Sequence, residues 1–195
     1  MRYWTGKTIR LRAIQPKDAE LFDQFDDEVD LHVDQIQFPQ SKERTASWLE
    51  SQQKTKLGDA YRFIAELADG TAVGTIDTFA CQRRHGTFKY GVAVARPFRG
   101  HGYAAEMIIL VLTYYFQELG YQKATPHVYS FNEASIRLHE RLGFTLEGRL
   151  RNMIYTNGRY FDELHYGMTI QEFRAWHGGS AGYPVRKEEG AENEC

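Results

Sequence analysis

Short stretches rich in β-branched and aromatic residues recur along the chain, and several alternate apolar with polar positions as a half-buried strand does. They predict seven strands, at residues 8–13, 61–67, 72–79, 87–95, 123–129, 145–155 and 159–169. Asp69-Gly70 and Asn157-Gly158 each separate two of these stretches, so each predicts a tight hairpin turn.

Apolar residues at helical spacing occupy much of the remaining chain. They predict a helix after Pro16, helices over residues 41–57, 104–119 and 133–142, and one further helical turn over 170–176. The 104–119 stretch is apolar on most sides, so this helix is expected to be buried against a sheet. The order β-α-α-β-β-β-α-β-α-β-β predicts an α/β fold with one mixed sheet and helices on both faces.

The composition fits one packed domain, residues 1–176, followed by a Gly-rich and then charged tail, 177–195, that is expected to be disordered. Of the 195 residues, 42% are hydrophobic and 14% aromatic, which suits a globular core. The formal net charge of −2 argues against a general nucleic-acid binder, which is usually strongly basic. No apolar run approaches a membrane span and no signal-peptide pattern opens the chain, so a cytoplasmic protein without membrane partners is expected.

A turn rich in Gly, Pro and Arg joins the 87–95 strand to the long apolar helix. The first N–H groups of a helix lack intrahelical partners and carry the positive end of its dipole, so this junction can hold a phosphate or pyrophosphate. Gly100 and Gly102 permit positive φ angles and a close approach to the backbone, and Arg99 adds a cation. The spacing does not fit a dinucleotide fingerprint or a Walker loop, and a Gly-containing turn before a helix can also bind nothing.

Two sequence motifs in this order are similar to the acyl-CoA signatures of the GNAT N-acetyltransferase superfamily. The first, Arg/Gln-x-x-Gly-x-Gly/Ala, is met by Arg99, Gly102 and Ala104. The second, Asn-x-x-Ser/Ala-x-x-Leu followed by Gly-Phe, is met by Asn132, Ser135, Leu138, Gly143 and Phe144. The resemblance extends element by element from Thr8 to Thr169.

The resemblance implies a GNAT fold, in which a mixed sheet of six to seven strands is flanked by four helices and two central strands splay apart. By analogy these are 87–95 and 123–129, and their exposed edges accept the pantetheine arm of acetyl-CoA, at Val92 and Val94. The pyrophosphate would lie on the backbone of the turn, at Arg99, Gly100, His101, Gly102, Tyr103 and Ala104. Asn132 would hydrogen-bond the CoA arm, although a helix N-cap role explains this residue equally well. Acetyl-CoA is then the acetyl donor, and no metal is implied.

The resemblance also implies that a bound amine attacks the thioester directly. Many family members place Glu on the strand before the Asn and Tyr on the helix after it, whereas this chain has His127 and His139 there. An imidazole titrates near neutrality, so we expect His127 to act as the base and His139 to help protonate the thiolate. Ser135, one helical turn before His139, is the alternative acid-side hydroxyl. The competing interpretation is a structural pair, with His127 in the core and His139 on the surface.

Two features bear on the acceptor amine. Residues 8–12, 142–148 and 158–164 resemble the branch that includes ribosomal-protein N-terminal acetyltransferases. This branch also holds small-molecule enzymes, and the leading acceptor that the resemblance implies is a protein N-terminal amine. An acidic segment between Asp23 and Asp34 favours a cationic acceptor, a basic peptide or a small polyamine, unless it is a solvated surface. The alternative from another class is a catalytically weak CoA-binding module. An exposed sheet edge or residues 170–176 could also build a homodimer.

Overall fold

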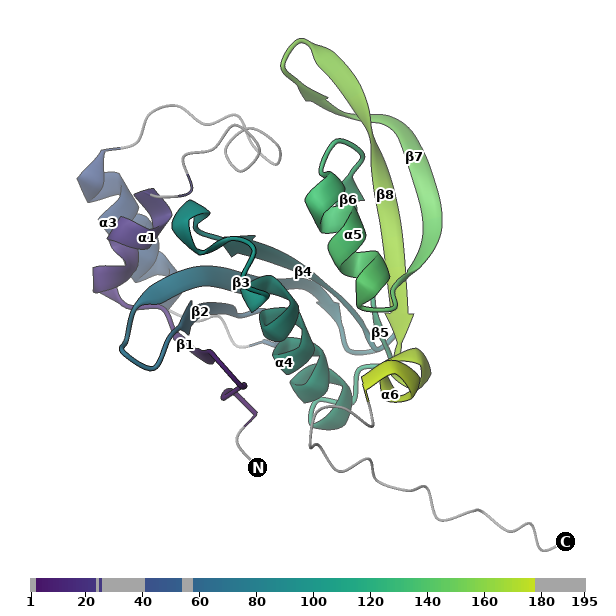
Figure 1. Cartoon of the computed structure of the whole chain (residues 1–195), viewed down its shortest axis with the longest axis horizontal. Coiled ribbons are helices and arrows are strands. Elements are labelled where there is room, and N and C mark those ends of the chain that lie inside the picture. Colours follow the sequence, from purple (N-terminus) through teal and green to yellow (C-terminus); the bar gives the residue numbers. More distant parts are fainter. Residues whose placement is uncertain (1–2, 24, 26–40, 54–57, 178–195) are drawn as a thin grey trace, which may run out of the picture.

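The computed structural model describes residues 3–23, 25, 41–53 and 58–177, and these form one eight-stranded mixed sheet (Figure 1). Strands β1 (Arg10–Ala13), β2 (Arg62–Glu66), β3 (Ala72–Gln82) and β4 (Thr87–Val94) are antiparallel neighbours in that order. Beyond β4 lie β5 (Lys123–Ala124), β6 (His127–Tyr129), β7 (Thr145–Thr156) and β8 (Arg159–Thr169). The α/β fold class expected from the sequence is therefore confirmed.

The predicted strand 123–129 is two strands, because Pro126 interrupts it. Proline has no N–H to donate to a strand ladder, so pairing stops there. β5 pairs parallel to β4 through two residues only, opposite Thr87 and Phe88, whereas β6 pairs with β8. β4 and β6 therefore diverge, which produces the splay of central strands that the family resemblance implies.

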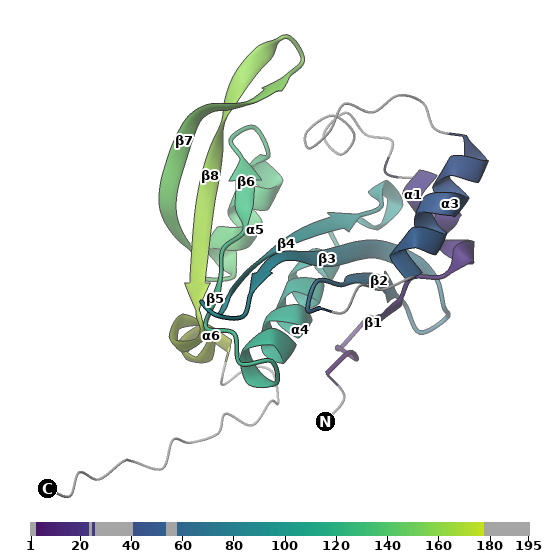
Figure 2. The same cartoon turned by 180° about the vertical axis from the view of Figure 1, so that it is seen from behind.

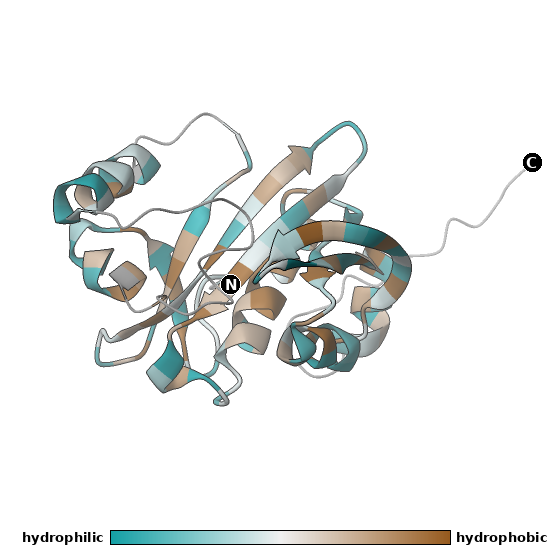
Figure 3. Cartoon of the chain, turned by 90° about the horizontal axis from the view of Figure 1, so that it is seen from above, coloured by the Kyte–Doolittle hydropathy of each residue, from teal (hydrophilic) through white to brown (hydrophobic). Residues whose placement is uncertain are grey.

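Helices cover both faces of the sheet (Figures 1 and 2). α4 (Tyr103–Gln117) and α5 (Glu133–Arg141) lie on one face, and α1 (Ala19–Asp23) and α3 (Lys42–Gln53) lie on the other. The large core cluster between α4 and the sheet includes Phe88, Ile108 and Tyr115, all buried. Bands of hydrophobic residues recur along the strands and on α4 (Figure 3). α6 (Ile170–His177) follows directly after β8.

β7 and β8 form a long hairpin arm that projects from the end of the sheet (Figures 1 and 2). Its tip is the expected Asn157-Gly158 turn, with φ of 50° and 76°, which is the left-handed conformation that such turns need. Among the described strands, β7 pairs with β8 alone, so its other side is a free edge.

Most of the acidic segment Asp23–Asp34 and nearly all of the expected tail lie outside the described residues. No helix within the described ranges is both long and apolar enough to span a membrane.

Candidate functional site

The backbone of β4 is open along the splay. The C=O of Phe88 accepts a hydrogen bond from the Thr125 N–H (2.8 Å), so it points toward β5, while the Ala95 N–H points the other way, to Val73 O (2.9 Å). Because backbone groups alternate along a strand, those of Val92 and Val94 point toward the splay, as Phe88 does. Beyond Phe88 no described strand pairs with this edge. An extended ligand could therefore pair with β4 as a strand would.

The turn after β4 connects the open end of this strand to the start of α4. Gly102 is the N-cap residue with φ of 84°, and Gly100 has φ of 82°. A Cβ at either glycine would meet nothing within 4 Å, so backbone conformation and not crowding requires glycine here. The first helical bond runs from the Glu106 N–H to Gly102 O, and among the described residues no side-chain cap is recorded at this helix start. This helix end can therefore bind an anionic group.

Two side chains hold the turn in place. The Arg99 Nε donates to Val94 O (3.0 Å), which ties the guanidinium to the end of β4. The His101 Nδ1 lies 2.9 Å from Arg99 O, and since a carbonyl only accepts, this nitrogen carries the proton. The His101 ring stacks on Tyr103 with centroids 5.6 Å apart. The predicted phosphate-binding residues thus lie together on one turn at the end of the open edge.

Asn132 lies at the other side of the splay, at the start of α5. Its Oδ1 accepts a hydrogen bond from the Ser135 N–H (3.0 Å), so the N-cap role that the sequence suggested is present. A role toward CoA stays a prediction for this residue.

His127 lies on β6 with its side chain on the face opposite α5. Its neighbour Val128 is buried in the core cluster beneath the helices, so His127 and Tyr129 point the other way. The His127 ring lies 6.4 Å from the ring of Phe79 on β3. Phe79 in turn follows Thr78, whose hydroxyl lies 2.6 Å from the Tyr115 hydroxyl on the α4 face. His127 is half-buried on the α1–α3 side of the sheet, and its Nδ1 is buried.

His139 lies in the core. The alternative that placed His127 in the core and His139 on the surface is therefore wrong for His139. Only 3% of it is exposed, and its ring stacks between Tyr90 (5.9 Å) and Tyr166 (5.6 Å). Its Nδ1 donates to Ser135 O (2.8 Å), which leaves the Nε2 lone pair buried without a hydrogen-bond partner among the described residues. Burial lowers the pKa of His139, so the imidazole is neutral near pH 7.

Three polar side chains near the splay were not among the expected site residues. Glu163 and His165 lie on β8 directly opposite Tyr129 and His127, and Tyr90 projects from β4 with a buried hydroxyl. Burial raises the pKa of Tyr90 well above its ordinary range, so this phenol stays protonated. Alternation within the predicted strand 159–169 places Glu163 and His165 on one face, but only the pairing register places them beside His127.

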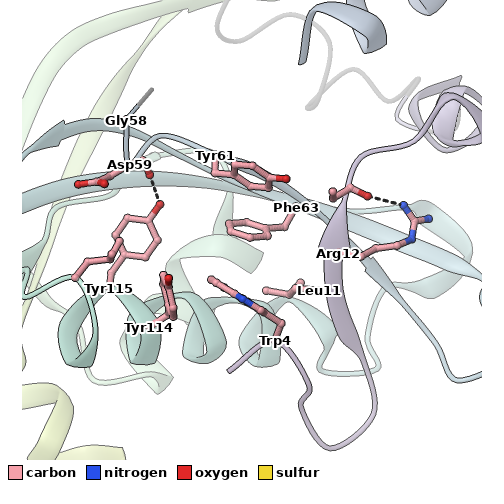
Figure 4. Close-up of a pocket in the computed structure, with 11 residues that line it drawn as sticks. Trp4, Leu11, Arg12, Gly58, Asp59, Tyr61, Phe63, Tyr114 and Tyr115 are labelled. Atoms are coloured by element: carbon pink, nitrogen blue, oxygen red, sulfur yellow. Dashed lines mark hydrogen bonds between the residues drawn. The ribbon is translucent and has the colours of Figure 1, made fainter. Parts of the chain in front are cut away.

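A separate pocket of about 360 Å³ lies between α4 and the strands β1 and β2 (Figure 4). Its walls are largely aromatic, from Trp4, Tyr61, Phe63, Tyr114 and Tyr115. Its charged lining residues are already paired, Arg12 with Asp18 (2.7 Å) and Asp59 with Arg83 (2.6 Å). The pocket shares no lining residue with the splay, so we do not assign it to the candidate site.

Comparison with known proteins agrees with this geometry. The model of the family described as "Acetyltransferase (GNAT) domain" matches residues 8–145. The prophage-derived uncharacterized N-acetyltransferase YokL of Bacillus subtilis is 50% identical over 176 residues, which are 90% of this chain and 98% of YokL. The putative ribosomal N-acetyltransferase YdaF of the same organism is 26% identical, covering 85% of this chain and 93% of YdaF.

A crystal structure of spermidine N-acetyltransferase from Vibrio cholerae, in complex with CoA and spermine, has the same fold. It superposes with a TM-score of 0.75 at 22% identity and covers 85% of this chain and 98% of that one. The splayed sheet, the glycine-containing turn before α4 and the family match agree with one another. The chain belongs to the GNAT family and is an acetyltransferase.

Proposed function

We propose that this protein transfers an acetyl group from acetyl-CoA to a primary amine on a cationic acceptor. One observation carries the proposal: the open edge of β4 at Val92 and Val94 runs directly into the uncapped start of α4 at Gly102. An amide-containing arm can pair with the open edge of β4, and a pyrophosphate can bind at the start of α4. This arrangement fits the two parts of CoA in the order in which they are joined.

Acetyl-CoA supplies an acetyl group already activated as a thioester. The amine nitrogen forms a bond to the acetyl carbon, the carbon–sulfur bond breaks, and the amine must give up a proton. His127 lies where an acceptor on the α1–α3 side would meet the splay, and we propose it as the base that takes this proton. The proton that neutralises the departing thiolate comes from solvent or from a nearby hydroxyl.

Ser135 suits the acid side better than His139. The single N–H of neutral His139 is held by the Ser135 carbonyl, so this ring has no proton to offer a thiolate. The Ser135 hydroxyl lies 3.4 Å from the same His139 nitrogen on a half-buried turn of α5. It can rotate to donate to sulfur, and we assign His139 a supporting role in the packing of α5.

We propose a protein N-terminal amine as the leading acceptor. The similarity to YdaF over nearly its whole length supports this choice, as does the branch resemblance at residues 142–148 and 158–164. A polyamine is the second candidate, because spermidine N(1)-acetyltransferase of Vibrio cholerae is 31% identical over 101 residues, 58% of its length. Both acceptors are cationic primary amines.

The test is a thiol-release assay with acetyl-CoA and a panel of amines. The panel holds short basic peptides with free N-termini, spermidine, spermine, an aminoglycoside and an amino sugar, with N-acetylated peptides as controls. Turnover with free but not blocked peptides supports the leading acceptor, and turnover with spermidine alone supports the second. Acetyl-CoA binding without any turnover would favour the alternative, a CoA-binding module.

We also propose that the β7–β8 arm binds a second copy of this chain. Its described residues expose several large apolar side chains along a free strand edge: Leu146, Leu150, Met153, Tyr155 and Tyr160. Clusters of this kind usually mark interaction surfaces.

A further inference from the structure

Two side chains of β8 lie beside His127 and have no role in the chemistry above. In the β6–β8 ladder, His127 lies opposite His165 and Tyr129 lies opposite Glu163. Directly opposed residues share a face of the sheet, so all four side chains lie on the face opposite α5. The His127 and His165 ring centroids are 6.2 Å apart, a separation that one water molecule can bridge.

Glu163 and His165 are in direct contact on β8. The His165 Nε2 lies 2.6 Å from Glu163 Oε1, and the Glu163 side chain is only 13% exposed. Nε2 is buried and makes no hydrogen bond to a described residue, so the contact is an ion pair when His165 is protonated. His165 is 31% exposed, so it can exchange a proton with solvent.

We propose that Glu163 and His165 form the second half of the base site and carry away the proton that His127 removes from the amine. The proton leaves the amine nitrogen for the His127 imidazole, passes through water to the His165 imidazole, and is released to solvent. Only N–H and O–H bonds change, and no electrons are transferred. His165 and Glu163 are positioning residues in this scheme, which rests on the proposed function.

Glu163 lies within ion-pair distance of His165, and further charged groups lie on the same face of the sheet. Lys89 on β4, the register partner of Phe79, lies on the same face. Glu147 of β7 is already paired with Lys123 of β5 (2.6 Å) near Gly167. Within the described ranges, no three His, Cys, Asp or Glu side chains gather as metal ligands, so a proton-handling role fits this cluster better than a metal site.

The test compares the wild-type enzyme with Glu163→Gln and His165→Asn in the thiol-release assay across pH. We expect kcat to fall about tenfold to a hundredfold in both variants, while KM for the amine stays within about twofold. Loss of the Glu163 charge disfavours a cationic His127, so the acidic limb of the pH–rate profile moves to lower pH in Glu163→Gln. Glu163→Asp should recover part of the rate, and Glu147→Gln, the same change in the neighbouring ion pair, should leave rate and limb unchanged.

A second measurement does not depend on turnover. Imidazole proton resonances of His127 are followed by NMR through a pH titration of the CoA-free protein, assigned with a His127→Asn variant. The proposal predicts a lower titration midpoint of His127 in Glu163→Gln than in the wild type, and identical curves would overturn it. If thiol release is unchanged in both β8 variants, the proton-transfer role of Glu163 and His165 is overturned, but the proposed function is not. Absence of thiol release from the wild type with every amine would overturn the proposed function as well.

Discussion

His127 and His139 carry the same side chain in opposite surroundings. His127 is half-buried on the splayed strand β6, whereas His139 lies in the core between two tyrosine rings. The same imidazole is therefore suited to proton exchange at one position and to neutral packing at the other. The two substitutions below should separate these roles.

His127→Ala should reduce kcat about a hundredfold to a thousandfold, because an amine that is protonated near neutrality loses its base. The acidic limb of the pH–rate profile should disappear with it. The measurement is thiol release against pH, with His85→Ala in the exposed β3–β4 loop as the control. A His127→Ala enzyme with wild-type kcat at all pH values would remove His127 as the base.

His139→Phe should reduce the loss of stability in acid. The unfolded chain protonates this imidazole near its ordinary pKa of 6.5, whereas the folded protein does so only at lower pH. Below pH 6.5 the unfolded state binds more protons, so the free energy of unfolding decreases as the pH decreases. Phe fits between Tyr90 and Tyr166 and cannot be protonated. Thermal unfolding from about pH 8 to pH 5 should show a shallower decline of Tm for the variant, and parallel curves would contradict this account.

At the scale of single elements, local residues explain most boundaries. Asn132 starts α5 through its cap, and Asn157-Gly158 turns the β7–β8 hairpin. Pro126 ends β5, and that break could have been predicted, since proline rarely continues a central strand. Its consequence, the divergence of β6 from β4, depends on the pairing of β6 with β8 instead.

Gly102→Ala should weaken both the start of α4 and the binding of CoA. Its φ of 84° costs an L-residue about 1–2 kcal/mol, and no neighbour would clash with the added Cβ. We expect the free energy of unfolding to fall by about 1 kcal/mol and CoA affinity to fall about tenfold as the helix end shifts.

The matched control is Gly58→Ala, where φ is not positive and an added Cβ also meets nothing within 4 Å of it. It should leave CoA affinity unchanged in a calorimetric titration. Equal affinities for wild type and Gly102→Ala would show that the turn does not depend on this glycine.

At the scale of the whole molecule, β8 contributes Leu164, Tyr166 and Met168 to the core, whereas the outer part of the β7–β8 arm lies outside the core cluster. Met153 and Tyr155 are 53% and 61% exposed on it, beside the free edge of β7. Apolar groups on an unpaired edge favour association with another chain. We therefore expect self-association through this arm.

Met153→Lys should shift the protein to monomer, because a charge on the arm would have to be desolvated in the interface. Light scattering coupled to size-exclusion chromatography measures the mass, and Ser51→Lys on α3 places the same charge away from the arm. A monomeric wild type at assay concentrations would contradict the proposed interface.

Features that depend on residues close together in the chain can be predicted from the amino-acid sequence alone. The helix and strand order, the hairpin turns, the cap at Asn132 and the turn at Gly102 all follow from local preference and short spacing. The family motifs were found for the same reason, because each one lies within a single turn or helix.

Which side chains of different elements face one another depends on the tertiary structure. The placement of Glu163 and His165 beside His127 depends on the β6–β8 register, and a shift of one residue would turn both to the opposite face. The burial of His139 depends on how α5 packs over Tyr90 and Tyr166. Register and packing arise from contacts between distant parts of the chain, so neither could be read from local pattern.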